Sequence, residues 1–366
     1  MKNNRILFLL HLPPPVHGSS MVGKWINESR LVNVSFDCRY INLLASKSVN
    51  DTGKFTIGKI LGMLMIFVKL LQELFFHQPN KVYFALTTTG FAFYRDFIFV
   101  FFIKLFRIKI IFHLHNKGIK NASKHRLNKV LYRFVFKNTK VILLSKNLYF
   151  DIEQYVKLKH IEICPNGIPD INNEEVLSLK KEVSIIPKIL FLSNLIESKG
   201  VYILLEALNI LKNKNTNFEA IFVGGEGDIL SEDFNKKIKN LDLQNEVKYL
   251  GKKYGKEKEN IYLNSDIFVF PTFYHNETFG LVLIEAMQYS LPVISCPEGG
   301  IPDIVEDGIN GILVPQKNIE ELANAIEKLI YDSELRTKMG NEGRLKYEKQ
   351  FTLETFEKKL VSILNK

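Results

Sequence analysis

Short apolar runs alternate with longer segments of helical periodicity along both halves of the chain. In the first half, strand-like runs at 5–11, 81–86, 108–115 and 140–145 precede helical patterns at 20–31, 90–106, 122–137 and 147–157. In the second half, runs at 188–194, 218–225, 246–251, 267–272 and 292–296 alternate with helical patterns at 199–212, 229–240, 256–263, 278–289 and 319–330. This rhythm is typical of parallel βαβ units. The pattern therefore predicts an α/β chain with two doubly wound domains.

The segment between the two series is rich in turn formers. It reads CPNGIPDINNEEVLSLKKEVSIIPK from Cys164 to Lys188, a composition that marks a connection between elements. We therefore predict a first domain over residues 1–165, a linker over 166–187 and a second domain from residue 188. Ligands of open α/β sheets bind beyond the carboxyl ends of the strands, so we expect the functional site in a cleft that the two domains face.

Two further segments, 58–76 and 91–106, are strongly apolar. Lys59 and Lys69 interrupt the first, and Arg95, Asp96 and Lys104 interrupt the second. Neither reaches the run of about 20 apolar residues that a membrane span requires. We therefore predict helices buried against a parallel sheet rather than membrane spans.

Charge is distributed unevenly between the two halves. Residues 1–165 hold 25 Lys and Arg against 8 Asp and Glu, whereas the rest of the chain holds 24 against 31. Residues 97–150 contain twelve basic residues and no acid, and such a field attracts phosphate-bearing ligands or surfaces. Nucleic acid and an anionic membrane are both open as partners at this point.

The cysteines and the N-terminus bear on the compartment. The three cysteines are scattered, with neither a zinc spacing nor a disulfide framework. The apolar run near the N-terminus is short, lacks a small-residue cleavage site and is typical of a first strand. These features favour a reducing cytoplasm.

Polar residues follow several of the predicted strands. HLPPPVHGSS at 11–20 joins the first strand to a helix that Ser19 or Ser20 could cap, and Gly18 would allow a ligand close to the backbone. His113 and His115 share one side of their strand by the two-residue period. A metal held by this pair is rejected because no third ligand lies nearby in the sequence. An ordinary turn and a structural histidine remain the alternatives.

In the second half, Lys199 stands just before a helix, where a cation and helix amides together suit a diphosphate. Gly224, Gly225 and Gly227 follow a strand and form either a tight turn or room for a nucleotide. The stretch PTFYHNETFGLVLIEAM at 271–287 carries Glu277 and Glu285 around a helix start. Amides of Phe279, Gly280 and Leu281 would face an anion there while the two carboxylates accept hydrogen bonds from hydroxyls. The combination favours a sugar nucleotide.

Glu277 and Glu285, with the downstream LPVISCPEGGIPDIVEDGINGILVP, closely resemble the C-terminal signature of family 4 of the retaining glycosyltransferases, a group with the GT-B architecture. The match is strong over residues 271–315, and the other landmarks follow the family's order along nearly the whole chain. The resemblance implies two Rossmann-like domains, with the second ending at residue 345. It also implies a C-terminal helix, 346–366, that packs back on the first domain.

The resemblance also implies roles for individual residues. Glu277 would hold hydroxyls of the donor sugar, Glu285 the ribose and Lys199 the diphosphate, and the amides of 279–281 would bind sugar and phosphate. Gly18 and Gly224 would lie against the donor, and His115, rather than His113, would be the active-site histidine. The chain departs from the family at Ser193 and Asn194, where many members have Gly-Arg, and at Asp303, often Glu. Lys199 would therefore neutralise the diphosphate alone or with help from the basic domain.

The function implied is transfer of a sugar, with retained configuration, from a UDP- or GDP-sugar to a glycan acceptor. We expect no metal and no other cofactor, no nucleic acid partner, and a leaving phosphate that takes the acceptor proton, with Glu277 as the alternative nucleophile. The basic stretch 116–140 suggests a lipid-linked acceptor in surface polysaccharide assembly. We expect a cytoplasmic location, peripheral on the inner membrane face. A nucleotide-sugar epimerase of the same architecture and a non-catalytic nucleic-acid-binding protein are the alternatives.

Overall fold

The computed structural model describes residues 4–44, 57–171 and 186–366, with side chains left undescribed at 57–60. The chain divides into two compact units. The N-terminal unit comprises Met1–Gly167 and Leu353–Lys366, and the C-terminal unit comprises Ile168–Thr352. Each unit contains one six-stranded parallel sheet.

The first sheet has the strand order β2-β1-β3-β4-β5-β6. Its strands are β1 (Arg5–Leu10), β2 (Asp37–Asn42), β3 (Lys81–Phe84), β4 (Lys109–Leu114), β5 (Lys140–Leu143) and β6 (Ile161–Ile163). The order reverses at β1, because β2 pairs on one side of it and β3 on the other. Residues Ile6–Leu10 are almost fully buried, as expected for a central strand covered on both faces.

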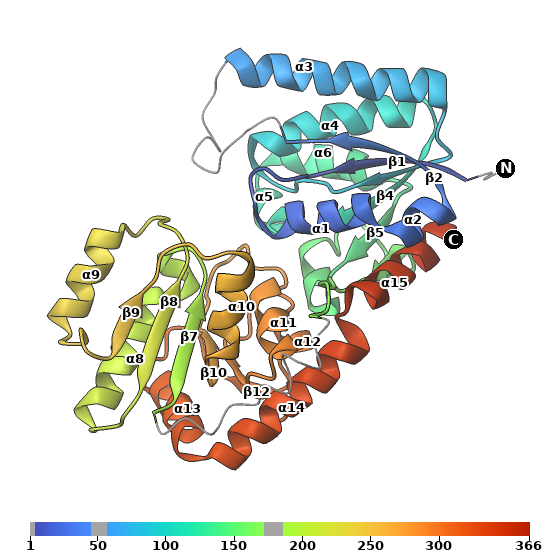
Figure 1. Ribbon diagram of the computed structural model, residues 1–366. Helices are drawn as coiled ribbons and strands as arrows, with labels where there is room; N and C mark the ends of the chain where they lie inside the picture. The colour runs from blue at the N-terminus through green and yellow to red at the C-terminus, as the bar shows by residue number, and fades with distance from the viewer. Residues whose placement is uncertain (1–3, 45–56, 172–185) are drawn as a thin grey trace. The chain divides into compact units, whose positions relative to one another are not determined.

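Helices cover both faces of this sheet (Figure 1). They are α1 (Gly18–Glu28), α2 (Arg30–Ser35), α3 (Ile57–Gln72), which runs into the π-turn η2 (Glu73–His77), α4 (Gly90–Leu105), α5 (Ile119–Ala122), α6 (Arg126–Phe136) and α15 (Leu353–Asn365). Helices α3, α4 and α6 lie on one face, and α1 and α2 lie on the other. The C-terminal α15 packs against α2, and Lys81 Nζ donates to the Leu364 carbonyl at 2.6 Å.

The second sheet has the order β12-β11-β10-β7-β8-β9. Its strands are β7 (Lys188–Leu192), β8 (Glu219–Val223), β9 (Val247–Tyr249), β10 (Ile267–Phe270), β11 (Val293–Ser295) and β12 (Gly311–Leu313). The order reverses at β7, which pairs with β10 and β8. In a doubly wound sheet this reversal is where ligands bind, because the connections leave its two sides in opposite directions.

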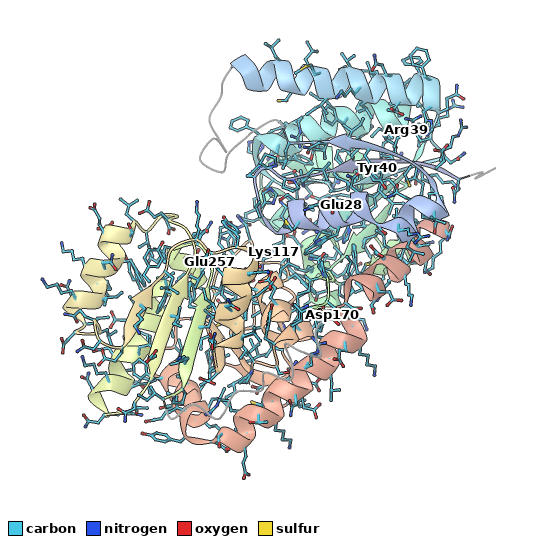
Figure 2. All side chains as sticks on the ribbon, viewed as in Figure 1. Glu28, Arg39, Tyr40, Lys117, Asp170 and Glu257 are labelled. Carbon is cyan, nitrogen blue, oxygen red and sulfur yellow. The ribbon has the colours of Figure 1, made fainter. Side chains whose placement is uncertain are left out.

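The helical elements of the C-terminal unit are η5 (Glu197–Lys199), α8 (Val201–Asn213), α9 (Ser231–Asn240), α10 (Gly255–Leu263), α11 (Leu281–Gln288), α12 (Ile301–Ile304), α13 (Ile319–Tyr331) and α14 (Ser333–Gln350). Helix α8 packs on α13, and α11 packs on α14. Arg344 of α14 donates to Asp170, which Figure 2 labels, at 3.2 Å and to the Gln288 carbonyl at 2.9 Å. These bonds hold the start of the unit against its last helix.

The two predicted parallel sheets are confirmed, but several predicted bounds differ. The C-terminal unit begins at Ile168, within the predicted linker, and 172–185 lie outside the described residues. The segment 346–366 was predicted as one helix. It comprises the end of α14 and a separate α15, because the helix is interrupted at Phe351 and Thr352, and only α15 belongs to the N-terminal unit. The predicted helix at 147–157 is a 3-10 turn, η3 (Lys146–Asp151), and the strands β2, β6 and β12 were not predicted.

The prediction that 58–76 is a buried helix is wrong for much of its length. Leu70 and Leu74 are buried, but Leu61, Leu64 and Met65 are more than half exposed. Apolar periodicity shows that a helix forms but leaves open which surface covers it.

Candidate functional site

Lys199 lies at the reversal point of the second sheet. It ends the turn η5 after β7, and Gly200 follows with a φ of 87° at the start of α8. A Cβ on Gly200 would lie 2.3 Å from the Pro271 carbonyl oxygen. Only glycine therefore permits the start of α8 to touch the loop after β10, and this contact brings Lys199 to that loop.

Lys199 pairs with Glu277. Its Nζ lies 2.5 Å from Glu277 Oε2, and the two side chains are only 15% and 11% exposed. The ammonium also lies 4.5 Å from the ring centre of Tyr274 and 5.3 Å from that of Phe270. An aromatic cage and a carboxylate stabilise the cation. The structure thus brings together two residues that are 78 positions apart in the chain and that the sequence assigned to one site.

The backbone around Glu277 is fixed by glycines. Gly299 has a φ of 56°, and a Cβ there would lie 2.2 Å from the Glu277 carbonyl oxygen. Gly280 precedes α11 with a φ of 81°. Within the described residues, the amide N–H groups of 279–281 form no hydrogen bond. These three amides retain their donor capacity for a ligand, and their binding of an anion stays a prediction.

Glu285 is held against helix α10. Its two carboxylate oxygens accept from Lys258 Nζ and from the Tyr262 hydroxyl, each at 2.9 Å. Tyr262 is buried, and burial together with the Glu285 charge raises its pKa well above the ordinary value. Sequence reasoning did not find Lys258 and Tyr262, since their helix carries no motif. Their spacing of four on one helix face is a signal only once Glu285 is known to lie opposite.

The glycine turn after β8 packs against the end of β7. A Cβ on Gly224, which has a φ of 149°, would lie 1.8 Å from the Ser193 carbonyl oxygen. Asn194 Oδ1 accepts from the Gly225 amide at 3.1 Å. Asn194, which stands where many family members have arginine, thus holds this turn. A second cation is close, because a Cβ on Gly225 would lie 2.0 Å from Lys252 Cε.

In the N-terminal unit, His113 and His115 lie on the same side of β4, with ring centres 4.1 Å apart. His113 is fully buried, and its Nδ1 lies 2.5 Å from the Tyr83 hydroxyl. His115 is partly exposed at the strand's end. Burial, and secondarily the nearby His17, lower the pKa of His115 to about 4. His115 is therefore a neutral imidazole at physiological pH, with the exposure that a ligand needs.

A second pair of histidines, His11 and His17, lies near His115 and was not predicted as part of the site. His11 follows β1, and burial, with smaller effects of Arg95, His17 and His115, lowers its pKa to about 3. Helix α1 passes close above His11, because a Cβ on Gly23 would lie 2.0 Å from the His11 carbonyl oxygen. The feature of the sequence that could have revealed this cluster is His11, the last residue of the first predicted strand run.

The prediction that Ser19 or Ser20 caps the first helix is wrong. His17 is the N-cap, its Nδ1 accepts from the Ser20 amide at 3.3 Å, and Ser20 Oγ accepts from the His17 amide at 2.9 Å. An imidazole nitrogen acts here as the acceptor that a hydroxyl or carboxylate usually provides. Gly18 becomes the first residue of α1 and is exposed.

The loop after His115 is anchored by a carboxylate. Asp151 is buried and accepts from the amides of Gly118, Ile119 and Lys120 at 2.8–3.0 Å. These are the donors at the start of α5, so Asp151 occupies that helix terminus.

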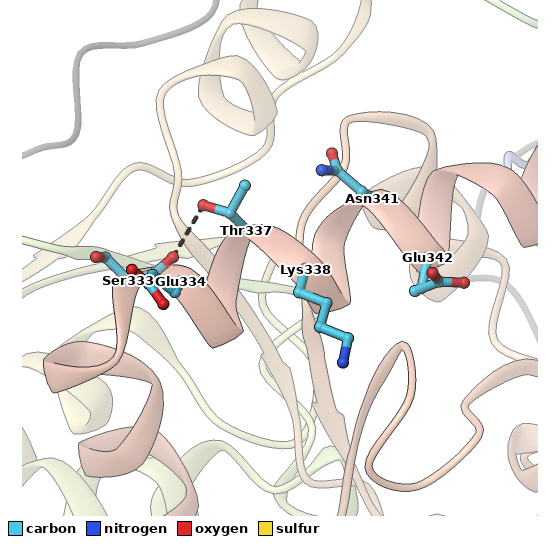
Figure 3. Close-up of a pocket in the computed structure, with 6 residues that line it drawn as sticks. All are labelled: Ser333, Glu334, Thr337, Lys338, Asn341 and Glu342. Atoms are coloured by element: carbon cyan, nitrogen blue, oxygen red, sulfur yellow. Dashed lines mark hydrogen bonds between the residues drawn. The ribbon is translucent and has the colours of Figure 1, made fainter.

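One groove in the C-terminal unit contains none of these residues. It measures about 570 Å³ and is lined only by α14, at Ser333, Glu334, Thr337, Lys338, Asn341 and Glu342 (Figure 3). The Thr337 hydroxyl donates to the Ser333 carbonyl at 2.9 Å within the helix. One face of one helix offers no converging groups, so we assign it no role. Across the described ranges, no group of three or more His, Cys, Asp or Glu is arranged to hold a metal ion.

Comparison with known proteins gives a similarity to one family and a likeness of fold. Residues 180–346 match the model of the family described as glycosyl transferases group 1. An uncharacterized glycosyltransferase of Methanocaldococcus jannaschii is 31% identical over 240 residues, which are 64% of this chain and 61% of that protein. The capsular polysaccharide biosynthesis glycosyltransferase CapM of Staphylococcus aureus is 30% identical over 48% of this chain and 45% of its own length. The chain thus matches 45–61% of the length of these relatives.

Among solved structures, HepE of Anabaena in complex with UDP and glucose superposes with a TM-score of 0.73 at 20% identity, over 99% of this chain and 100% of that one. At this identity the likeness concerns the fold. The predicted GT-B architecture is confirmed. No helix among the described residues has both the length and the apolar character needed to cross a membrane.

Proposed function

We propose that this chain, whose residues 180–346 match the model of the glycosyl transferases group 1 family, is a retaining glycosyltransferase of the family 4 kind. It transfers a sugar from a nucleotide-diphosphate sugar to a glycan acceptor in surface polysaccharide assembly. The observation that carries the proposal is the buried Lys199–Glu277 pair at the reversal point of the second sheet. A lysine beside a carboxylate at that point provides a cation for phosphate and an acceptor for sugar hydroxyls.

The donor is proposed to bind in the C-terminal unit. Lys199 contacts the diphosphate, the amides of 279–281 bind sugar and phosphate, and Glu277 holds donor hydroxyls. Glu285, oriented by Lys258 and Tyr262, takes the ribose. Gly224 lies against the nucleotide, and Gly18 of the N-terminal unit completes the donor contacts. The complexes of HepE with UDP and glucose support a UDP-sugar, and a GDP-sugar is the alternative donor.

The proposed reaction breaks the bond between the anomeric carbon and the diphosphate oxygen and forms a bond to an acceptor hydroxyl on the same face of the sugar. The acceptor proton passes to the leaving phosphate. Lys199 and the helix amides stabilise the negative charge that develops on the diphosphate, so the proposal requires no metal. From the N-terminal unit, His115 contributes as a neutral hydrogen-bonding imidazole, in keeping with its low pKa.

The acceptor is proposed to be lipid-linked, and the enzyme to work in the cytoplasm at the inner membrane face. The N-terminal unit carries the chain's basic excess, with Lys120, Lys124, Lys129 and Arg133 exposed on or beside α5 and α6. Lipid headgroups attract each such residue with about 1 kcal/mol. The similarity to CapM supports a role in capsule-like polysaccharide synthesis.

The donor experiment is a thermal-shift screen of the whole chain with UDP- and GDP-sugars, because a ligand that binds only the folded state raises the melting temperature. We expect one sugar nucleotide to stabilise the wild type, with the shift lost in Lys199→Met and in Glu285→Gln. Lys236→Gln, an exposed lysine on α9, is the matched control and should keep the shift. If no sugar nucleotide stabilises the wild type, the proposal is wrong.

Turnover separates this function from its alternative. Nucleotide release that requires an added glycan acceptor supports transfer, whereas equal release without acceptor favours an epimerase or hydrolase. The anomeric configuration of the product, read by NMR coupling, tests retention. Turnover that persists in EDTA tests the expected independence from metal.

A further inference from the structure

Helix α3 exposes an apolar stripe on its outer side. Leu61, Leu64, Met65 and Val68 are each 45–62% exposed, and their spacing places them on one helix face. The inner side packs on α4, where Phe67 lies 4.9 Å from Phe102, ring centre to ring centre. Figure 1 shows α3 as the outermost helix on this face of the sheet. Half of this apolar helix therefore faces solvent within its own unit.

The stripe continues onto neighbouring elements. In η2, Phe75 and Phe76 are 59% and 86% exposed, and Phe75 packs against Phe106 at the end of α4 with ring centres 4.8 Å apart. Helix α4 adds a second stripe of exposed apolar residues, Ile98, Phe101 and Leu105. We refer to the exposed residues of α3, η2 and α4 as the outer face. Exposed apolar residues gathered on three neighbouring elements mark a site of interaction with another body.

Most charges beside the outer face are positive, and the exception in η2 is the partly exposed Glu73. Residues 57–72 contain no acid, and the one acid of α4, Asp96, is buried in an ion pair with Arg95 at 2.6 Å. At the end of α4 a pocket of about 320 Å³ is lined by Lys104, Arg107, Lys109 and Lys137, among others. Lys104 Nζ donates to the carbonyls of Phe134 and Lys137, each at 2.6 Å. These hydrogen bonds fix Lys104 in the wall of the pocket. The remaining basic side chains, Arg107, Lys109 and Lys137, favour an anionic partner.

We propose that the outer face docks on an anionic lipid leaflet, with its apolar side chains in the acyl boundary and the basic pocket beside lipid phosphates. An apolar helix face flanked by cations is the pattern of interfacial membrane binding. A second copy of the chain fits less well. A symmetric contact would bring two copies of the same basic pocket toward each other, and like charges repel. Lipid phosphates instead neutralise the pocket.

This inference deepens the proposed function, which already places basic residues of α5 and α6 at the membrane, because it adds an apolar contact made by α3, η2 and α4. It rests on the proposed function in one respect: a lipid-linked acceptor gives the enzyme a reason to bind a membrane. Lipid binding is measured without donor or acceptor, so the two can fail separately.

The experiment is flotation of the full chain with vesicles of phosphatidylcholine containing phosphatidylglycerol, compared with phosphatidylcholine alone, at low and high salt. We expect flotation with the anionic vesicles that salt weakens and does not abolish, since screening affects only the charged component. The double variant Leu64→Gln with Met65→Gln should lower the partition coefficient at least about tenfold at both salt concentrations. Its control, Leu230→Gln with Leu345→Gln, changes exposed leucines of the C-terminal unit and should float as wild type.

The basic pocket is tested with Arg107→Gln and Lys137→Gln together. Each lost charge should lower partition about fivefold at low salt, with little change at high salt. The control pair is Lys236→Gln with Lys239→Gln on α9. The substituted positions of both tests, Leu64, Met65, Arg107 and Lys137, are exposed. Melting temperatures should therefore stay near wild type, and a loss of flotation will not result from unfolding.

Three outcomes would overturn the proposal. The first is a wild type that does not float with anionic vesicles at low salt. The second is test and control pairs that lose flotation equally. The third is a lipid-free dimer, seen in sedimentation velocity, that Leu64→Gln with Met65→Gln dissociates while flotation is unchanged, which would assign the outer face to a second copy.

Discussion

The Lys199–Glu277 pair gives the sharpest test, because a structural pair and a binding pair respond differently to removal of both charges. Lys199→Met leaves the Glu277 carboxylate, 11% exposed, without its cation. Stranding one partner of a largely buried pair costs about 3 kcal/mol. For a domain the size of the C-terminal unit, each kcal/mol lowers the melting temperature by about 2–4 °C, so we expect a fall of about 6–12 °C.

Adding Glu277→Gln to Lys199→Met removes both charges at nearly constant volume. Such double replacements are often close to neutral, so we expect the melting temperature to return to within about 4 °C of wild type. Binding of the sugar nucleotide should not return, because the phosphate cation and the carboxylate acceptor are both absent. Recovered stability together with lost binding is the signature of a binding pair.

The assay is a thermal melt of wild type, both single variants and the double variant, each with and without the sugar nucleotide found in the screen. Lys253→Met is the control. Its pair with Glu257 has a similar distance of 2.8 Å, but Glu257 is 68% exposed, and an exposed pair contributes under about 1 kcal/mol. If the double variant binds the sugar nucleotide as wild type does, the pair is structural and the donor-site assignment fails.

Three further predictions follow from the site. Gly224→Ala should lower the melting temperature of the C-terminal unit by several degrees, since a Cβ would lie 1.8 Å from a carbonyl oxygen; an unchanged melt in calorimetry would contradict this packing. Lys258→Met should weaken sugar-nucleotide binding about tenfold by releasing Glu285 from one of its partners, as titration calorimetry would detect. Stability should fall as the pH drops below about 6.5, because His115 and His11, with pKa values of about 4 and 3, stay neutral in the folded chain while they become protonated in the unfolded chain. The free energy of unfolding should change by up to about 1.4 kcal/mol per pH unit for each histidine. In melts from pH 7 to 5, His115→Asn should reduce this slope.

Much of the fold followed from the sequence because central parallel strands are apolar throughout. β1, β7 and β10 have this character in their buried residues, β4 has it apart from His113, and all four were predicted. The missed strands lie at sheet edges or are three residues long. β2, with the sequence DCRYIN, is mostly half-exposed, so it alternates polar and apolar residues and resembles a loop. Edge strands are less buried than central ones, and a strand is recognised in a sequence by the apolar residues that burial requires.

The candidate site was predicted where one short motif carries several roles and missed where roles come from separate elements. Glu277, Gly280 and Glu285 lie within nine residues. Lys258 and Tyr262 reach Glu285, and Lys252 reaches the turn at Gly225, from elements with no motif of their own. Their roles depend on which strands are neighbours, and strand order is a property of the folded sheet.

The incorrect prediction for α3 shows where periodicity stops carrying information about function. A helix that is apolar on all sides satisfies the hydrophobic effect equally well in a protein core or at a lipid boundary. What separates the two is position, and α3 packs one side on α4 and has no strand of the sheet beyond it in the described part of the chain. Its outer residues would then be a cost to a chain that stayed in water, since exposed apolar patches favour aggregation. The absence of acids along this helix adds a preference for an anionic surface. The same sequence that first argued for a buried helix therefore argues, once its place in the unit is known, for a surface that a membrane covers.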